Sequence, residues 1–262
     1  MNYLLIPFLV LIAGLSQAAP TGNCNTTQIA NITHLQANST HPLTSALPYG
    51  AVLTHCTVPG TIALTFDDGP YIYTAQILDT LAQHGARATF FLNGRNKGSI
   101  DAFSDLVLRA YEEGHQLGSH TYTHASLDTL SYQEIIHQMT TLEEAFVHIL
   151  GFFPTYMRLP FLRHSPLVLT AMADLQYHVI GASVDTKDYE HDDPVSNWIS
   201  FEKFKAEVDA GGSVVLAHDA HQYTVELLVV NMLEEVERRG LIPVTVGECL
   251  GDSVGNWYRT KR

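Results

Sequence analysis

Basic residues are scarce in this sequence. Lysine and arginine number 14 against 27 aspartates and glutamates, which gives a net charge of −13. Nucleic-acid binding depends on a basic surface that displaces phosphate counterions, so this charge balance argues against a nucleic-acid partner. A glycine-rich nucleotide motif, internal repeats and low-complexity runs are absent between residues 56 and 250. With 46% apolar and 10% aromatic residues over 262 positions, the chain is predicted to be globular with a substantial core.

Long hydrophobic runs are also rare. Residues 3–15 form the one extended apolar stretch, which is too short to span a bilayer. Small residues follow it, so residues 1–18 are predicted to be a signal peptide that is cleaved after Ala18. Residues 251–262 are polar, which predicts a C-terminal tail without a hydrophobic anchor. We therefore expect a secreted, extracellular protein.

The segment that follows the signal peptide is polar in composition. Residues 19–55 are rich in threonine, asparagine, serine and proline. Three N-glycosylation sequons lie within it, at Asn25, Asn31 and Asn38. The segment is therefore predicted to be a glycosylated, weakly structured N-terminal extension.

Cysteine is scarce too, with three in the chain. An oxidising extracellular compartment permits disulfides between them. Cys56 precedes the first predicted strand and Cys249 follows the last, so a bridge between them would join the two ends of the domain. The sequence alone permits three pairings, because Cys24 could bond to either of the other two.

From residue 61 onward, short β-rich runs alternate with amphipathic helical periodicity. The last predicted helix runs from Gln222 to Arg239 and ends at Gly240. Repeated βα units imply a parallel sheet with right-handed crossovers, and seven units favour an α/β fold with a closed or nearly closed barrel. An open doubly wound sheet is the alternative. The predicted strands span residues 61–66, 88–93, 116–120, 156–161, 177–183, 213–218 and 242–246.

Two adjacent carboxylates end the first of these strands. The run 61–66 is apolar and β-branched and stops at Asp67, Asp68 and a Gly-Pro turn. This pattern is typical of a buried parallel strand that delivers side chains to a surface loop. In a βα barrel, polar residues at the C-terminal strand ends meet at one mouth, which predicts an active site. The other strand ends supply His120, His124, Arg158, Asp185 and His218.

His120 and His124 are separated by three residues. We interpret them as two imidazoles one helical turn apart, which can face the same cation. With a carboxylate from Asp67 or Asp68 they would supply three ligands and leave an open position for water, as catalytic zinc requires. A non-haem iron oxygenase also uses two histidines and one carboxylate, so it is an alternative interpretation of this set.

These residues lie in motifs that resemble, in order, the five motifs of the polysaccharide deacetylases. The motifs are Thr65–Pro70, His120–His124, Arg158–Phe161, Asp185–Tyr189 and Leu216–His218. Such a NodB-homology domain defines carbohydrate esterase family 4, and the secreted, glycosylated context is most similar to that of fungal chitin deacetylases. The resemblance covers residues 56–250 and implies that they form the catalytic domain, a distorted (β/α) barrel with about seven parallel strands.

The resemblance implies a metal site and a general base. Asp68, His120 and His124 would bind one divalent metal ion, with zinc as the first expectation and cobalt as the alternative. Asp67 would be the general base that takes a proton from the attacking water. Arg158 would orient that base and balance its charge.

The resemblance also implies a general acid and substrate contacts. His218 would protonate the leaving amine, and Asp185 would hold its imidazole in the productive orientation. The backbone N–H of Phe161 would stabilise the oxyanion. Leu216 would line the acetyl pocket, and Tyr189 would contact the sugar. The family pattern supports the Cys56–Cys249 disulfide as well.

Together these roles imply a metal-dependent hydrolase that removes N-acetyl groups from N-acetylglucosamine units of chitin or chitooligosaccharides and releases acetate. The alternatives are an O-acetyl esterase acting on acetylated xylan and a peptidoglycan N-acetylglucosamine deacetylase. A catalytically inactive carbohydrate-binding protein would require the loss of a catalytic group, and all of them are present. We expect a monomer whose partner is its carbohydrate substrate.

Overall fold

The computed structural model of this protein describes residues 47–262. The predicted signal peptide, Cys24 and the sequons at Asn25, Asn31 and Asn38 lie outside the described residues. Among the residues that are described, no helix combines the length and the apolar character needed to cross a membrane.

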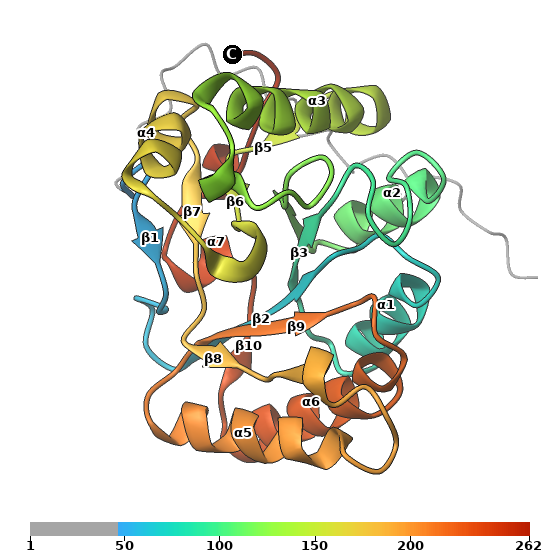
Figure 1. The fold of residues 1–262 in the computed structure, drawn as a ribbon. Coiled ribbons are helices and arrows are strands. Elements are labelled where there is room, and N and C mark those ends of the chain that lie inside the picture. The colour runs from blue at the N-terminus through green and yellow to red at the C-terminus, as the bar shows by residue number, and fades with distance from the viewer. Residues whose placement is uncertain (1–46) are drawn as a thin grey trace, which may run out of the picture. The chain divides into compact units, whose positions relative to one another are not determined.

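Parallel strands form a curled sheet at the centre of the fold (Figure 1). The hydrogen-bonded order is β1-β7-β6-β4-β3-β2-β9-β8, and β10 pairs with the first residues of β2. The parallel βα barrel predicted from the sequence is confirmed. The barrel is partly open, because β1 and β8 stand at the two ends of the strand order. The strands of the sheet are β1 (Val52–Leu53), β2 (Thr61–Asp67), β3 (Thr89–Leu92), β4 (Gln116–Ser119), β6 (Tyr156–Met157), β7 (His178–Ile180), β8 (Val184–Asp185), β9 (Val214–His218) and β10 (Ile242–Pro243).

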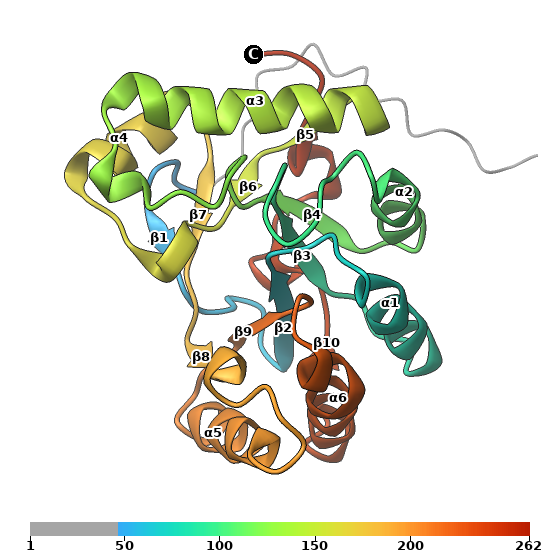
Figure 2. The same ribbon diagram turned by 45° about the vertical axis from the view of Figure 1, so that its right-hand side comes forward.

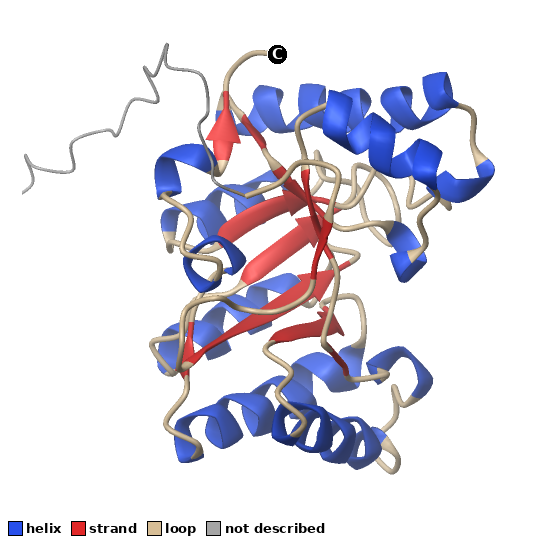
Figure 3. Cartoon of the chain, turned by 90° about the vertical axis from the view of Figure 1, so that its left-hand side faces the viewer, coloured by secondary structure: helices blue, strands red, loops and turns tan. Residues whose placement is uncertain are grey.

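Helices α1 to α6 surround this sheet (Figure 2), and Figure 3 shows the strands between them. The predicted last helix is confirmed, with a π-helical turn at Thr224–Leu228 that leads into α6, and Gly240 follows it with a φ of 67°. The helices are α1 (Thr74–Gln83), α2 (Ser104–Glu112), α3 (Tyr132–Leu150), α4 (Pro166–Asp174), α5 (Asn197–Asp209), α6 (Val229–Arg238) and α7 (Val246–Cys249). Short 3-10 turns lie at Leu127–Thr129, Pro160–Leu162, Asp188–Glu190 and Val254–Asn256.

The two faces of β2 have different neighbours. Ile62, Leu64 and Phe66 are fully buried in the core cluster that includes α1 and α6. Because side chains alternate along a strand, Thr65 and Asp67 point to the opposite face, inside the curl of the sheet. The same alternation that builds the core therefore delivers the Asp67 carboxylate to the barrel interior.

Most of the predicted strands are shorter in the structure, and two of them end early because the chain enters a helical turn or a helix. The strand predicted over 156–161 ends at Met157, and the chain enters a 3-10 turn at Pro160. The strand predicted over 242–246 ends at Pro243 because Thr245 and Glu248 form a capping box that begins α7. The apolar alternation predicted a strand, but the local hydrogen bonds of the cap favour a helix.

The Cys56–Cys249 disulfide is present and joins the segment before β2 to α7. Backbone N–H groups of Thr57 and Val58 both donate to the carbonyl of Cys249, so hydrogen bonds reinforce the same junction. Of the three pairings that the sequence permits, the structure therefore contains the one that joins the two ends of the domain.

The packed domain extends beyond the predicted boundaries at 56 and 250. At its start, β1 pairs with β7. At its end, β11 (Tyr258–Arg259) pairs antiparallel with β5 (Phe153–Pro154). Trp257 is only 5% exposed, and a Cβ at Gly247 would lie 2.2 Å from its indole nitrogen. Residues 251–262, expected to be a polar tail, are therefore part of the folded domain.

Candidate active site

Asp67 and His218 stand side by side at the ends of neighbouring strands. Strands β2 and β9 pair in parallel with Asp67 opposite His218. In a parallel pair, residues at the same level present their side chains to the same face of the sheet. Asp67 and His218 therefore both face the cavity at the C-terminal ends of the strands, where a βα barrel collects its functional groups.

Arg158 holds the Asp67 carboxylate. Its Nη1 donates to Asp67 Oδ1 at 2.8 Å and also to the Thr65 hydroxyl, and Nη2 donates to the carbonyl of Gly181 at 2.8 Å. Arg158 is fully buried and Asp67 is 2% exposed. Burial raises the pKa of Asp67, and the adjacent guanidinium opposes that increase. The result is a buried, fixed carboxylate with one oxygen left to face the cavity.

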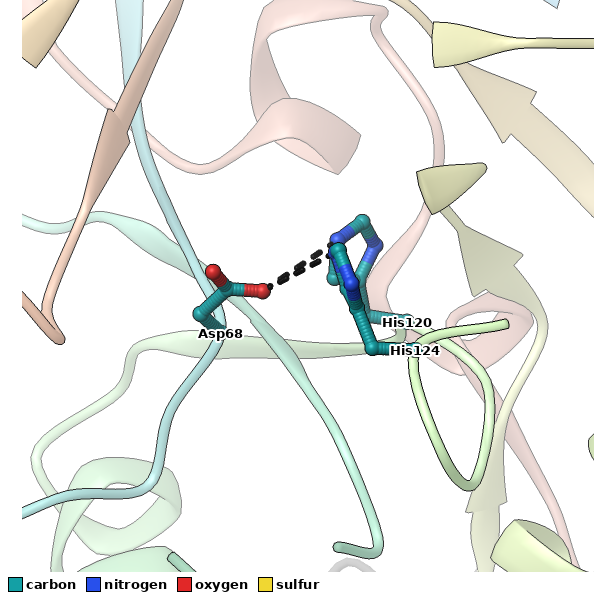
Figure 4. A group of neighbouring side chains, drawn as sticks. All are labelled: Asp68, His120 and His124. Atoms are coloured by element: carbon teal, nitrogen blue, oxygen red, sulfur yellow. Dashed lines mark ion pairs between the residues drawn. The ribbon is translucent and has the colours of Figure 1, made fainter. Parts of the chain in front are cut away.

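Asp68, His120 and His124 form a group whose potential ligand atoms all lie within 4.8 Å of one another (Figure 4). Asp68 Oδ1 lies 3.2 Å from His124 Nε2 and 3.7 Å from His120 Nε2. The two histidines do not lie on a helix, as the sequence analysis assumed. Instead Thr121 and His124 have positive φ values of 69° and 55°, and the loop turns both rings toward Asp68.

These residues fit a divalent cation. Asp68 Oδ1 is buried and has no hydrogen-bond partner in the described chain, which leaves a charged oxygen for a ligand to satisfy. His120 Nδ1 donates to the carbonyl of Arg158 at 2.8 Å, so the lone pair of its ring is on Nε2, toward Asp68. Burial lowers the pKa of His120 to about 3, which keeps its ring neutral. One carboxylate and two imidazoles are ligands typical of zinc.

The carboxylate that holds His218 is Asp188, so the prediction of Asp185 for this position is wrong. His218 Nδ1 donates to Asp188 Oδ1 at 2.8 Å, and the Thr224 hydroxyl and the His218 backbone N–H donate to Asp188 Oδ2. Burial acts to lower the pKa of His218, but the charge and hydrogen bond of Asp188 outweigh it and raise that pKa to about 9. His218 is therefore a protonated imidazolium at neutral pH.

The register of the sheet explains why Asp185 cannot reach His218. Asp185 stands opposite Leu216 in the β8–β9 pair, two residues before His218. Its carboxylate instead accepts from the backbone N–H of Lys187 and forms an ion pair with the Lys187 ammonium at 3.6 Å. Lys187 has a φ of 57°, and the 3-10 turn that follows brings Asp188 over β9. Asp185 lines the cavity without contact to the imidazole.

A cavity of about 450 Å³ contains these groups. Leu216 and Tyr189 line it, as predicted for substrate contacts. Phe161 lines it too, and its ring meets that of His124 edge-on with centroids 4.7 Å apart. The Phe161 backbone N–H lies in the first turn of a 3-10 helix, where a donor has no partner within the helix.

The sequence analysis missed two groups. Asp188 is the second acid of the motif that also contains Asp185. Its position three residues after Asp185 was the signal in the sequence that could have identified it as the partner of His218. His221 also lines the cavity, and its Nδ1 donates to Asp192 Oδ2 at 3.0 Å. No local pattern in the sequence connects positions 192 and 221.

The fold and the site match known proteins. The polysaccharide deacetylase family model covers residues 54–180, which include the Asp67–Asp68 pair, both ligand histidines and Arg158. A chitin deacetylase from Colletotrichum lindemuthianum is 45% identical over 219 residues, which are 81% of this chain and 88% of that protein. The chain therefore belongs to the polysaccharide deacetylase family. Its members use a divalent metal, in agreement with the three-residue metal group.

Two further comparisons refine this likeness. The solved structure of the chitin deacetylase from the fungal pathogen Colletotrichum lindemuthianum superposes with a TM-score of 0.80 at 43% identity, over 82% of this chain and 98% of that one. A probable peptidoglycan-N-acetylglucosamine deacetylase from Arthroderma benhamiae is 55% identical over 83% of this chain. The chain spans only 50% of the length of that relative, so the two proteins are comparable over this domain alone.

Proposed function

We propose that this protein is a secreted, metal-dependent hydrolase that removes N-acetyl groups from N-acetylglucosamine units of chitin or chitooligosaccharides and releases acetate. One observation carries the proposal. A buried carboxylate, Asp67, and a protonated imidazole, His218, flank a group of three potential metal ligands in one cavity. Amide hydrolysis needs a proton acceptor for water, a proton donor for the amine and a stabilised oxyanion.

Asp68, His120 and His124 would hold the cation, and the ligand set favours zinc, with cobalt as the alternative. When bound there, a divalent cation supplies Lewis-acid polarisation and lowers the pKa of water. The protein contributes a preformed set of ligands. His120 is held in one tautomer by the Arg158 carbonyl, and the Phe161 ring packs against His124.

Asp67 would act as the general base. Its position at the end of β2 is fixed by Arg158, which also keeps the carboxylate ionised. Burial raises the pKa of Asp67, which makes it a better proton acceptor than an exposed aspartate. As water attacks the acetamide carbon, its proton passes to the carboxylate and the carbonyl oxygen becomes an oxyanion. The backbone N–H of Phe161 is the donor we assign to that oxyanion.

His218 would act as the general acid. Its Nδ1–H is engaged by Asp188, so the proton on Nε2 is the one available to the leaving nitrogen. Transfer of that proton as the C–N bond breaks yields acetate and the free amine of the sugar. Asp188 takes the orienting role that the sequence analysis gave to Asp185. Leu216, which is 6% exposed at the cavity wall, would contact the acetyl methyl group.

The substrate assignment rests on relatives. The Colletotrichum protein is a chitin deacetylase and shares both the sequence and the fold of this chain. The Arthroderma protein bears the name of a probable peptidoglycan-N-acetylglucosamine deacetylase, so peptidoglycan is the second candidate substrate. Both substrates contain the same N-acetylglucosamine unit. We further propose that residues 1–18 direct secretion, that Asn25, Asn31 and Asn38 carry N-linked glycans, and that the enzyme acts as a monomer.

The test is acetate release by the purified protein from N-acetylglucosamine oligomers, peptidoglycan and acetylated xylan. Activity on the oligomers should fall after chelation and return when zinc is restored. Asp67→Asn, which keeps the side-chain shape but cannot accept the proton as a carboxylate does, should be inactive on all three. If the zinc-loaded protein released acetate from xylan alone, it would be an O-acetyl esterase, and the proposed substrate would be wrong.

A further inference from the structure

A second imidazole–carboxylate pair lines the catalytic cavity. His221 follows β9, and its Nδ1 donates to Asp192 Oδ2 at 3.0 Å. Asp192 follows the 3-10 turn that carries Asp188, so the two pairs join the same two loops. The mechanism above uses His218 and Asp188 and gives no task to His221 or Asp192.

The second pair is held in one orientation. Asp192 Oδ1 accepts the backbone N–H of Tyr223 at 2.9 Å while Oδ2 binds the His221 ring. Because Nδ1–H donates to the carboxylate, Nε2 is the ring nitrogen that can meet a ligand. The His221 side chain is 19% exposed. An imidazole nitrogen of fixed orientation is therefore present at the cavity wall.

His221 lies beside the proton donor without hydrogen-bonding to it. The rings of His218 and His221 meet edge-on, with centroids 5.6 Å apart and planes at 87°. In the described chain, the side-chain hydrogen bond of His218 goes to Asp188. In the proposed mechanism, His218 delivers a proton to the nitrogen of the acetamide. The His221 ring is 5.6 Å from the His218 ring, so it is placed to meet the sugar substituents that flank this nitrogen.

Four histidines line the cavity in the described part of the chain. His120 and His124 belong to the metal group, and His218 is the proton donor. This leaves His221 as the imidazole that can recognise the substrate. The C3 hydroxyl of an N-acetylglucosamine unit lies next to its N-acetylated carbon, and a buried or half-buried hydrogen-bonding group with fixed geometry discriminates well between substrates with and without such a hydroxyl.

We propose that His221, held by Asp192, is a specificity-determining residue whose Nε2 forms a hydrogen bond with a pyranose hydroxyl adjacent to the acetamide. This assignment rests on the proposed deacetylase function. It explains why the enzyme needs a second oriented imidazole next to its general acid. The ligand group is a sugar hydroxyl, so a substrate without a sugar ring gains nothing from His221.

The experiment compares His221→Ala with the wild-type enzyme on two substrates, N-acetylglucosamine oligomers and 4-nitrophenyl acetate. Loss of one hydrogen bond should raise KM for the oligomers about fivefold, with kcat within about twofold. Hydrolysis of the aryl ester, which has no sugar hydroxyl, should keep its kcat/KM. Asp192→Ala should behave like His221→Ala. Asp192→Asn should have a smaller effect, since its amide oxygen still accepts the ring N–H.

His221→Gln provides the conservative rescue, because its amide oxygen is an acceptor of similar reach, and it should restore part of the lost affinity for oligomers. His164→Gln is the matched control, since His164 is an exposed histidine that does not line the cavity. It should leave both substrates unaffected.

Two results would overturn the assignment. A fall in kcat on the oligomers with unchanged KM in His221→Ala would mean that the residue only positions His218. Unchanged kinetics on both substrates would mean that it makes no contact with the sugar. Neither result affects the proposed function, which fails separately if the wild-type enzyme hydrolyses the aryl ester but releases no acetate from oligomers.

Discussion

The two sides of the catalytic cavity are built differently. On one side, Asp67, the proposed proton acceptor, is the last residue of β2 and is buried against Arg158, itself fully buried. On the other side, His218, the proposed proton donor, is held by Asp188, which comes from a 3-10 turn after β8. The acceptor is therefore fixed by the sheet and its core, whereas the donor is fixed by a loop that crosses over the sheet.

This difference has a physical consequence. A buried charge that loses its partner destabilises the whole fold, so substitutions on the sheet side should change both folding and catalysis. On the loop side, Asp188 is also fully buried, but Asp185, Lys187 and Asp192 are partly exposed, and water can replace a lost partner at those positions. Substitutions of the partly exposed groups, and the isosteric Asp188→Asn, should change catalysis or specificity while the domain remains folded. The following predictions separate these two behaviours.

The largest effect is expected for Asp67→Asn. General bases contribute about 10²- to 10⁴-fold, and we expect kcat for acetate release to fall about a thousandfold. Asparagine can still accept the Arg158 hydrogen bond through its amide oxygen, so the circular dichroism spectrum should stay that of the folded protein. Residual activity above a tenth of the wild-type value would show that another group accepts the proton.

Arg158→Met should have the largest effect on stability. It leaves Asp67 as a buried charge without its partner, which costs about 3 to 5 kcal/mol in unfolding free energy. The loop-side control is Lys187→Met, because Lys187 is 35% exposed in its ion pair with Asp185. Exposed pairs contribute about 0 to 1 kcal/mol, so this variant should be nearly as stable as the wild type. Urea denaturation of both variants measures the contrast, and equal losses would contradict it.

Asp188→Asn should lower kcat about a hundredfold, because the imidazole loses the charge that orients it and keeps it protonated. Asp185→Asn is the matched control and should change kcat by less than about threefold, since it has no contact with the ring. If the two variants behaved in the opposite way, Asp185 would hold the acid during catalysis and the assignment to Asp188 would be wrong.

The pH dependence of kcat gives a second test of the Asp188→Asn and Asp185→Asn variants. The pKa of His218 is raised to about 9 by Asp188, so the wild-type enzyme should keep a protonated donor up to that pH and lose kcat above it. In Asp188→Asn the raised pKa should move down toward its ordinary value. The alkaline fall in kcat should therefore begin at lower pH in this variant, while Asp185→Asn should keep the wild-type profile.

The smallest effects are expected at Tyr189. Its ring is 42% exposed and meets His218 edge-on, but its hydroxyl lies 3.4 Å from Asp185, which is long for a hydrogen bond. Tyr189→Phe should leave the kinetics within about twofold, because the ring is kept. Tyr189→Leu should raise KM for oligomers about threefold through loss of the aromatic surface. A larger effect of the phenylalanine variant would assign a role to the hydroxyl.

The elements that the sequence predicted well are those whose signals lie in neighbouring residues of the chain. The run 61–66 is apolar and β-branched and is followed by two acids, so both the strand and the position of the carboxylates at its end follow from neighbouring residues. The same holds for the helix that ends before Gly240, whose stop signal lies in the chain itself. Where the sequence analysis failed near 244–246, it overlooked the capping box of Thr245 and Glu248, which was also local and readable.

The sequence by itself determined which candidate residues stand at the strand ends: Asp67, Asp68, His120, Arg158 and His218. Periodicity and turn residues act between neighbours, so they can be read along the chain. Only the tertiary structure decided that Asp188 rather than Asp185 meets His218, that Asp192 reaches His221, and that residues 251–262 pack onto the domain. These choices depend on strand register and on the path of loops, which are set by contacts between residues far apart in the sequence.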